Sequence, residues 1–433
     1  MLPLVALVSA WFFHNAHAAR ERQIPTPHPS RAATPSQRAA QAAAAGELTR
    51  ARQELSAAQA EASNNVPALL VLACLELEEN HLSEAREVIA RLRAAAPDRP
   101  EPEFLERLLA HRQRAPSSRW GNAFFESWAA LDRPDFRHSP LLPDEDSLSP
   151  DDPEAEEAVW RQTPSAPIRL TLALASPELS EERARWLLQQ VPTLEDPALL
   201  AAASDVLSQR SLPAALRDEA VSALRQRLTR LVEASAPSMQ PRLLLLLAGT
   251  EAQAPLDARE LSVLDELSGL TPWKDTSYTR TFQTAREHLR EAGVPHPGAR
   301  AFLVAERATG AHSALLLLRR ANATREKLSE DERRWMGRML WRIGSRLTET
   351  SSYLEHSVGL LLMDFGADDL RDSCGQAEAS IRQDELSASA IALDKAAPGR
   401  WPLPSLQEEL EEARARDERA WLLFWLGKPT LLR

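Results

Sequence analysis

Two stretches of the chain match each other at a distance of 34 residues. The first reads GELTRARQELSAAQAEASNN from Gly46, and the second reads NHLSEAREVIARLRAAAPDR from Asn80. Glycine and asparagine tolerate the left-handed backbone conformation found at helix ends, and the small alanines that follow let two helices approach closely. The matched pairs are Gly46 and Asn80, Leu48 and Leu82, Ala51 and Ala85, and Leu55 and Ile89. The pattern predicts two helical units of the same design.

The period and spacing resemble the tetratricopeptide repeat, a helix–turn–helix unit. The second copy, about 66–99, matches the family pattern at Leu72, Ala73, Asn80, Leu82, Ala85, Ile89 and Pro97. It departs from the pattern at Glu76, where an aromatic residue is usual, and at Leu92, where alanine is usual. The first copy, about 32–65, matches at Gly46, Leu48, Ala51, Leu55 and Ala58, and it has Ser63 in place of the closing proline. With PEPEFLERLLAHRQR as a capping helix, the resemblance covers about residues 32–113; the alternative is two unrelated alanine-rich hairpins.

The resemblance also implies a binding groove, because the first helix of each tetratricopeptide repeat lines a surface that binds peptides. The matching positions are Leu70, Cys74, Leu77 and Glu78 in the second copy, and Phe104 and Leu108 in the capping helix. Such a mostly apolar groove suits a helix or an extended apolar peptide of another protein. The alternative is that another part of the same chain fills it.

The composition favours helix along the whole chain. Strand-forming residues are scarce, with 14 Val, 6 Ile and 2 Tyr among 433 residues, against long tracts of Ala, Leu, Arg and Glu. We therefore predict an all-α protein, with tetratricopeptide-like repeats at 32–115 and a larger helical domain, in the form of a solenoid or otherwise, at 168–433. Alignment of Pro177 with Pro213 hints at a 36-residue hairpin repetition of the HEAT type in this second domain.

The interval 116–167 differs from both neighbours. It begins with SSRWGNAFFESWAAL, in which Trp120, Phe124, Phe125, Trp128 and Leu131 follow one helical face. We expect this face to pack on a neighbouring domain; as an exposed face it would mark a partner site. A proline-rich acidic linker follows. Ten acidic residues and two arginines between residues 132 and 157 carry a local charge of −8, out of −11 for the chain. Because no basic face is visible, we expect no nucleic-acid partner.

The N-terminus, MLPLVALVSAWFFHNAHAAR, has an apolar run over residues 2–13 followed by the small–x–small sequence Ala16-His17-Ala18. This pattern predicts a signal peptide at 1–18, cleaved after Ala18, and a flexible proline-rich segment at 19–31. The missing basic residue before the run is atypical, and the alternative is a membrane anchor through an uncleaved N-terminal segment. Twelve apolar residues fall short of the roughly 20 that span a bilayer, so we expect no membrane span in the mature chain.

No familiar catalytic or cofactor motif occurs in the sequence. Phosphate loops, dinucleotide fingerprints, HExxH, GxSxG and CxxC are missing, and we predict no catalytic, cofactor-binding or metal-binding residue. Cys74 and Cys374, 300 residues apart, are expected to be free buried thiols, unless an oxidising compartment and the fold allow them to pair.

Three functions are compatible with these observations. The first is an exported, periplasmic or extracellular scaffold or assembly subunit that binds another protein or peptide. The second is an enzyme with an active site in residues 168–433, which would have a deep pocket with converging polar groups. The third is a structural subunit of a larger complex, which would have wide exposed apolar patches.

Overall fold

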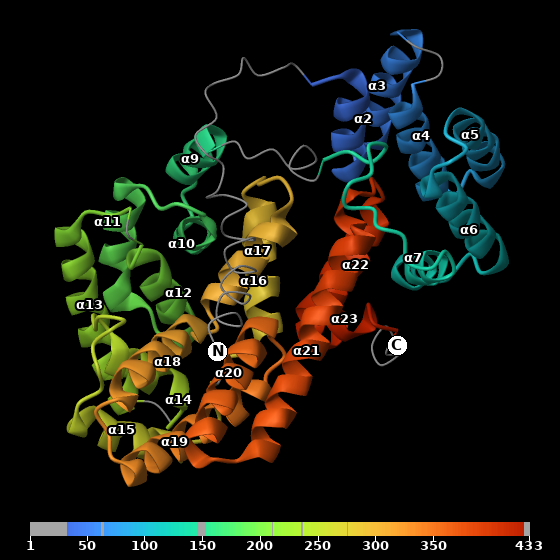
Figure 1. Ribbon diagram of the computed structural model, residues 1–433. Helices are drawn as coiled ribbons and strands as arrows, with labels where there is room; N and C mark the ends of the chain where they lie inside the picture. Colours follow the sequence, from blue (N-terminus) through green and yellow to red (C-terminus); the bar gives the residue numbers. More distant parts are fainter. Residues whose placement is uncertain are drawn as a thin grey trace.

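The prediction of an all-α protein is confirmed. The computed structural model describes residues 33–61, 65–144, 153–209, 211–234, 237–274 and 276–427, and these hold 21 α-helices and no strand (Figure 1). The predicted signal peptide and the segment 19–31 lie outside the described residues. The helices up to residue 207 are α2 (Pro35–Ala44), α3 (Leu48–Glu61), α4 (Val66–Glu78), α5 (Leu82–Ala95), α6 (Pro100–Arg114), α7 (Trp120–Ala129), α9 (Pro153–Gln162), α10 (Ala166–Ala175), α11 (Glu181–Gln190) and α12 (Pro197–Leu207).

The remaining helices continue to the end of the described chain. They are α13 (Ala214–Ala234), α14 (Met239–Leu247), α15 (Ala258–Ser268), α16 (Tyr278–Glu291), α17 (Pro297–Arg307), α18 (Ala311–Arg325), α19 (Glu330–Thr348), α20 (Tyr353–Leu370), α21 (Ser373–Ala396), α22 (Pro404–Arg416) and α23 (Glu418–Phe424). Helix α9 lies inside the interval predicted as linker, and α10 begins close to the boundary predicted at residue 168.

The two repeat copies form two helical hairpins, α2–α3 and α4–α5, in the register that the sequence predicts. The turn residues Gly46 and Asn80 have φ angles of 75° and 61°, which is the left-handed conformation expected of them. Ala51 and Ala85 are fully buried, as the helix crossings require. Helix α6 packs against α5, in the capping position.

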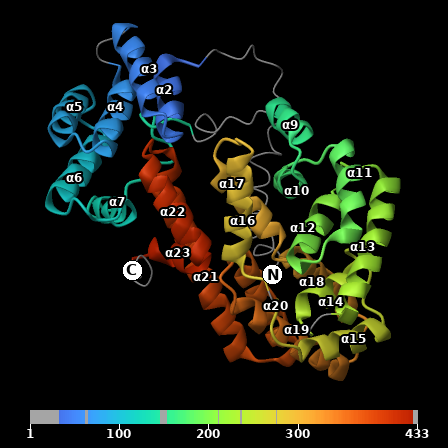
Figure 2. The same ribbon diagram turned by 180° about the vertical axis from the view of Figure 1, so that it is seen from behind.

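Helices α10 to α13, α16 and α17 enclose the largest apolar core in the described part of the chain; Figure 2 shows how these helices are arranged. The residues aligned by the weak 36-residue repetition are equivalent in burial, because Ala184 and Ala220 are both in this core, and so are Leu188 and Leu224. Residues 297–325 form two helices, α17 and α18, rather than one continuous helix. The chain turns between α17 and α18 at Gly310, which has a φ of 71°. Glycine adopts this left-handed conformation at little energetic cost.

Helices α19 and α20 pack with their backbones in close approach through two pairs of glycines. A Cβ atom added to Gly344 would lie 2.5 Å from the carbonyl oxygen of Gly359, and one added to Gly366 would lie 2.6 Å from that of Gly337. Each helix carries its two glycines seven residues apart, so both lie on the same face. No larger residue fits at these crossings without a shift of one helix.

The C-terminal segment returns to the N-terminal helices. Helix α21 leads away from α20, and α22 and α23 then pack near α7 (Figures 1 and 2). Helices α22 and α23 follow each other almost without a break in the chain. The two helices separate at Asp417, whose side chain accepts a hydrogen bond from the backbone N–H of Ala420 at 2.9 Å and caps α23.

Among the described helices, no single one is both long enough and apolar enough to cross a membrane, although the bent pair α17–α18 passes that test when taken together. Both cysteines are free thiols, but only Cys74 is buried. The expectation of two buried thiols is therefore wrong for Cys374, which is exposed at the start of α21.

Candidate functional site: the inner face of the repeats

The predicted groove residues do come together, but they are not open to a partner. Five of the six belong to one apolar core together with residues of the C-terminal segment, and Glu78 lies at its edge. The five apolar ones, Leu70, Cys74, Leu77, Phe104 and Leu108, have no solvent exposure. Burial raises the pKa of the Cys74 thiol, so it stays protonated and behaves as a small apolar side chain. Of the two alternatives for this groove, the structure has the one in which the chain fills it.

The residues that cover the groove come from the turn before α22 and from α22 itself. Trp401, Leu403 and Leu406 are all fully buried in the same core. The Trp401 ring lies 4.5 Å from the Phe104 ring, between centroids. At the edge, Glu78 accepts hydrogen bonds from both the backbone N–H of Ser405, at 3.2 Å, and its hydroxyl.

Arg400 fixes this cover in place. Its guanidinium, 7% exposed as a residue, donates hydrogen bonds to five backbone carbonyls of the segment after α7. The acceptors are Phe136, Arg137, Ser139, Leu142 and Pro143. An arginine has five N–H donors, so this single side chain can supply one donor to each of the five carbonyls. A lysine could not satisfy this geometry.

The aromatic face of α7 also packs in this core, as expected. Trp120, Phe124 and Trp128 are at most 5% exposed. The Phe124 ring lies edge-on to Trp401 and Trp425, at 6.0 and 6.1 Å between centroids. The repeats, the aromatic helix and the C-terminal segment thus share one core.

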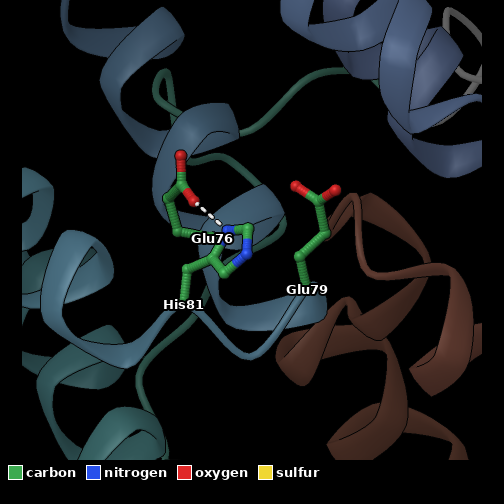
Figure 3. A group of neighbouring side chains, drawn as sticks. All are labelled: Glu76, Glu79 and His81. Atoms are coloured by element: carbon green, nitrogen blue, oxygen red, sulfur yellow. Dashed lines mark hydrogen bonds and ion pairs between the residues drawn. The ribbon is translucent and has the colours of Figure 1, made fainter.

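A charged cluster stands where the family pattern has an aromatic residue. Glu76 on α4 is 5% exposed, and Arg52 on α3 donates to both of its carboxylate oxygens, at 2.8 and 2.9 Å. Figure 3 shows His81 pointing at the same carboxylate, at 3.0 Å, with Glu79 beside them. Burial acts to raise the pKa of Glu76, but the hydrogen bonds from Arg52 and His81 outweigh it and hold the pKa below its usual value.

The same cluster has the ligand types of a metal site. Glu76, Glu79 and His81 offer three ligand atoms that lie within 4.8 Å of one another. Arg52 also donates to Glu79, at 3.0 Å from its Nε atom, so one guanidinium already bridges both carboxylates by hydrogen bonds. The cluster therefore closes the α3–α4 interface by ion pairing within the chain.

The comparison with known families agrees with the register of the helices. Residues 42–110 match the family model of the tetratricopeptide repeat. The match begins inside α2 and ends inside α6, so it includes the second hairpin whole, the first in part and most of the capping helix. No curated protein and no solved structure shows significant similarity to the chain.

A second, partly buried ionic cluster ties the C-terminal segment to the middle of the molecule, at a distance from the tetratricopeptide-like region. Arg414 of α22 donates to Glu306 of α17 and to Glu418 of α23, both at 2.8 Å. Burial raises the pKa of Glu306 to about 7, against the opposing effect of Arg414. The nearby Tyr278 is 3% exposed, and its hydroxyl has no hydrogen-bond partner.

The two clearest cavities in the described part of the chain are small. One of about 130 Å³ lies between α7 and α22, and one of about 280 Å³ lies between α5 and α6, in the tetratricopeptide-like region. Ligand pockets of enzymes usually measure roughly 300–1,000 Å³. Neither cavity brings together polar groups of residues 168–433 alone, as the enzyme hypothesis requires.

Several residues that shape this site were missed in the sequence. Arg400, Trp401 and Ser405 lie almost 300 residues or more from the groove that they cover, and no local pattern links them to it. The one signal in the sequence lies in WPLPSL, which holds two of them. Trp401 and Leu403 alternate with prolines there, which indicates an apolar segment that packs outside a helix, directly before α22 begins at Pro404.

Proposed function

We propose that the chain is an exported protein-interaction scaffold or assembly subunit that acts in the cell envelope or outside the cell. The observation that carries this proposal is the repeat region: two hairpins in tetratricopeptide register, within a segment that matches the family model. Repeats of this kind generally mediate protein interactions. The apolar run and Ala16-His17-Ala18 in the sequence support export.

Because the chain itself covers the groove, a partner binds elsewhere than in the groove that the family resemblance implies. Because Trp401 and α22 occupy the inner face of α4 and α6, the repeats in this protein serve to build a continuous helical frame. The partner then binds to an outer face of that frame. Large apolar side chains are exposed at two positions only in the described residues, Ile381 and Ile391, so the wide apolar patches expected of a structural subunit are not present in that part.

Affinity purification of the tagged full chain from its native organism, after cross-linking and with mass spectrometry, tests the scaffold function. We expect one or a few proteins in near-equal amount to the chain, none of which appears with the tag alone. Recovery of the chain without any cross-linked protein would overturn the proposal. N-terminal sequencing tests export separately: a mature chain that begins at Ala19 supports it, and a cytoplasmic chain that begins at Met1 contradicts it.

A further inference from the structure

Helix α21 has one covered face and one open face. Its inner face carries small and apolar residues that are buried against α20 and α23, such as Gly375, Ala379 and Leu386. The outer face carries Ile381, which is 61% exposed, and Ile391, which is 54% exposed. In the described residues these are the two exposed large apolar side chains, and both lie on this helix.

The exposed residues of α21 form a regular seam. Cys374, Ala377, Ile381, Asp384, Ala388 and Ile391 are all exposed and follow one another at alternating intervals of three and four residues. This is the spacing that keeps one line of residues facing a partner helix in a coiled coil. We call these six residues the outer seam; at 1.5 Å per residue it is about 25 Å long.

We propose that the outer seam binds an amphipathic helix of a partner protein, with basic residues beside its apolar face. This proposal rests on the scaffold function proposed above and names the surface and the chemistry of the partner. The two isoleucines supply the apolar anchors of the contact, and the alanines between them allow the helices to approach closely.

The charges around the seam favour a basic partner. Asp384 stands in the middle of the seam, between the isoleucines, and has no ion pair within the described structure. On α21 itself, four acidic side chains lie on or beside the seam, Glu378, Asp384, Glu385 and Asp394, against two basic ones, Arg382 and Lys395, which leaves a net charge of −2. Glu378 is ion-paired with Arg382, and Asp394 with Arg137 of the segment after α7, so Asp384 is the charge that a partner helix can pair. A Lys or Arg of the partner helix opposite Asp384 would complete a charge pair at the centre of the contact.

The same charges disfavour a second copy of this chain as the partner. In an antiparallel pair of α21 helices that sets Ile381 against Ile391 of the copy, Glu378 lies opposite Asp394 at each end. In a parallel pair, Asp384 lies opposite its own equivalent. Both arrangements bring like charges together, which is a cost that a partner with basic residues avoids.

Binding of two synthetic peptides to the full chain tests the proposal by fluorescence anisotropy. Both peptides carry leucine at the positions that face Ile381 and Ile391; one has lysine opposite Asp384 and at the flanking positions, and the other has glutamate at all of these places. The lysine flanks keep the first peptide from pairing with itself. We expect the lysine peptide to bind at least about tenfold more tightly than the glutamate peptide.

Three variants show whether that binding uses the outer seam. Asp384→Lys should weaken binding of the lysine peptide about tenfold, and so should the double change Ile381→Gln with Ile391→Gln. Asp331→Lys makes the same charge change on α19, where the side chain is 96% exposed, and should leave binding unchanged. Equal binding by all variants, or no binding of the lysine peptide, would overturn the proposal.

Two further outcomes separate this inference from the scaffold function. A chain that sediments as a dimer, and as a monomer after Ile381→Gln, would assign the seam to a second copy and overturn the proposal. A native partner that is captured equally by the wild-type chain and by the double isoleucine variant would leave the scaffold function standing and would place its binding surface elsewhere.

Discussion

Two helix faces in this protein carry apolar residues at regular spacing and differ in what covers them. The inner face of α4 and α6 is closed by Trp401 and α22 of the same chain, and its predicted groove residues have no exposed apolar surface. The outer face of α21 carries Ile381 and Ile391 and is open. Family resemblance favours the first as the binding surface, while accessibility favours the second.

The comparison shows that a helix pattern predicts an apolar face but not what will cover it. Covering the first face depends on Arg400, which joins a distant segment to five backbone carbonyls. The Arg400 guanidinium and these carbonyls can be buried together because each of these polar groups has a hydrogen-bond partner. The second face has acidic residues around it, and Arg137 of the segment after α7 pairs with one of them, Asp394, but its two isoleucines stay exposed.

The largest expected effect comes from removing the cover of the first face. Trp401→Ala takes a fully buried ring out of contact with Phe104 and Phe136, at 4.5 and 5.2 Å between centroids. Loss of a buried aromatic side chain costs roughly 3–5 kcal/mol of unfolding free energy. Urea unfolding of the full chain measures it. Trp335, which is only partly buried on α19, gives the matched control, and Trp335→Ala should cost less. Equal losses would mean that the cover is not a principal part of this core.

A smaller effect is expected inside the repeat itself. Ala85 is fully buried at the crossing of α4 and α5, so Ala85→Leu should destabilise the chain by about 1–3 kcal/mol through overpacking. Ala94 lies on the same helix and is exposed. Ala94→Leu should cost little, because leucine is nearly as good a helix former as alanine. Thermal unfolding of both full-length variants makes the comparison, and equal stabilities would contradict the register of the repeat.

The ionic link between the C-terminal segment and α17 should make the free energy of unfolding depend on pH, by about 1–2 kcal/mol. The pKa of Glu306 is about 7 in the folded chain, above its ordinary value of 4.5. Between these values the folded state holds a proton that the unfolded state has lost, so the free energy of unfolding falls as the pH rises. Glu306→Gln should remove that fall between about pH 5 and pH 7, as measured by urea unfolding. Glu349→Gln, at an exposed site, should leave it in place.

The sequence predicted local features well and distant ones poorly. Gly46, Asn80, Ala51 and Ala85 placed both hairpins correctly, because turn conformation and helix crossing depend on neighbouring residues. The bounds of α21 cannot be read from the sequence, because apolar residues line both its faces, which removes the single-sided pattern by which an individual helix is recognised.

The candidate site was predicted in part for the same reason. The five apolar groove residues do share a core, with Glu78 at its edge, but the segment that covers them follows about 290 residues later in the chain. The glycine pairs of α19 and α20 were visible in the sequence as two seven-residue intervals. That these glycines let the two backbones approach closely can be seen only from the packing of α19 against α20.

The smallest expected effect is on the open face of α21. Ile381→Gln should change the free energy of unfolding by no more than about 0.5 kcal/mol, because the side chain is mostly in water in the folded state as well as the unfolded state. Leu386→Gln on the same helix is the contrast: Leu386 is 2% exposed, and a buried amide without partners costs roughly 1–3 kcal/mol in addition to the lost apolar contacts. Urea unfolding at two protein concentrations measures both. A large, concentration-dependent loss for Ile381→Gln would mean that a second copy covers the seam in solution, and the two faces would then no longer differ in being covered.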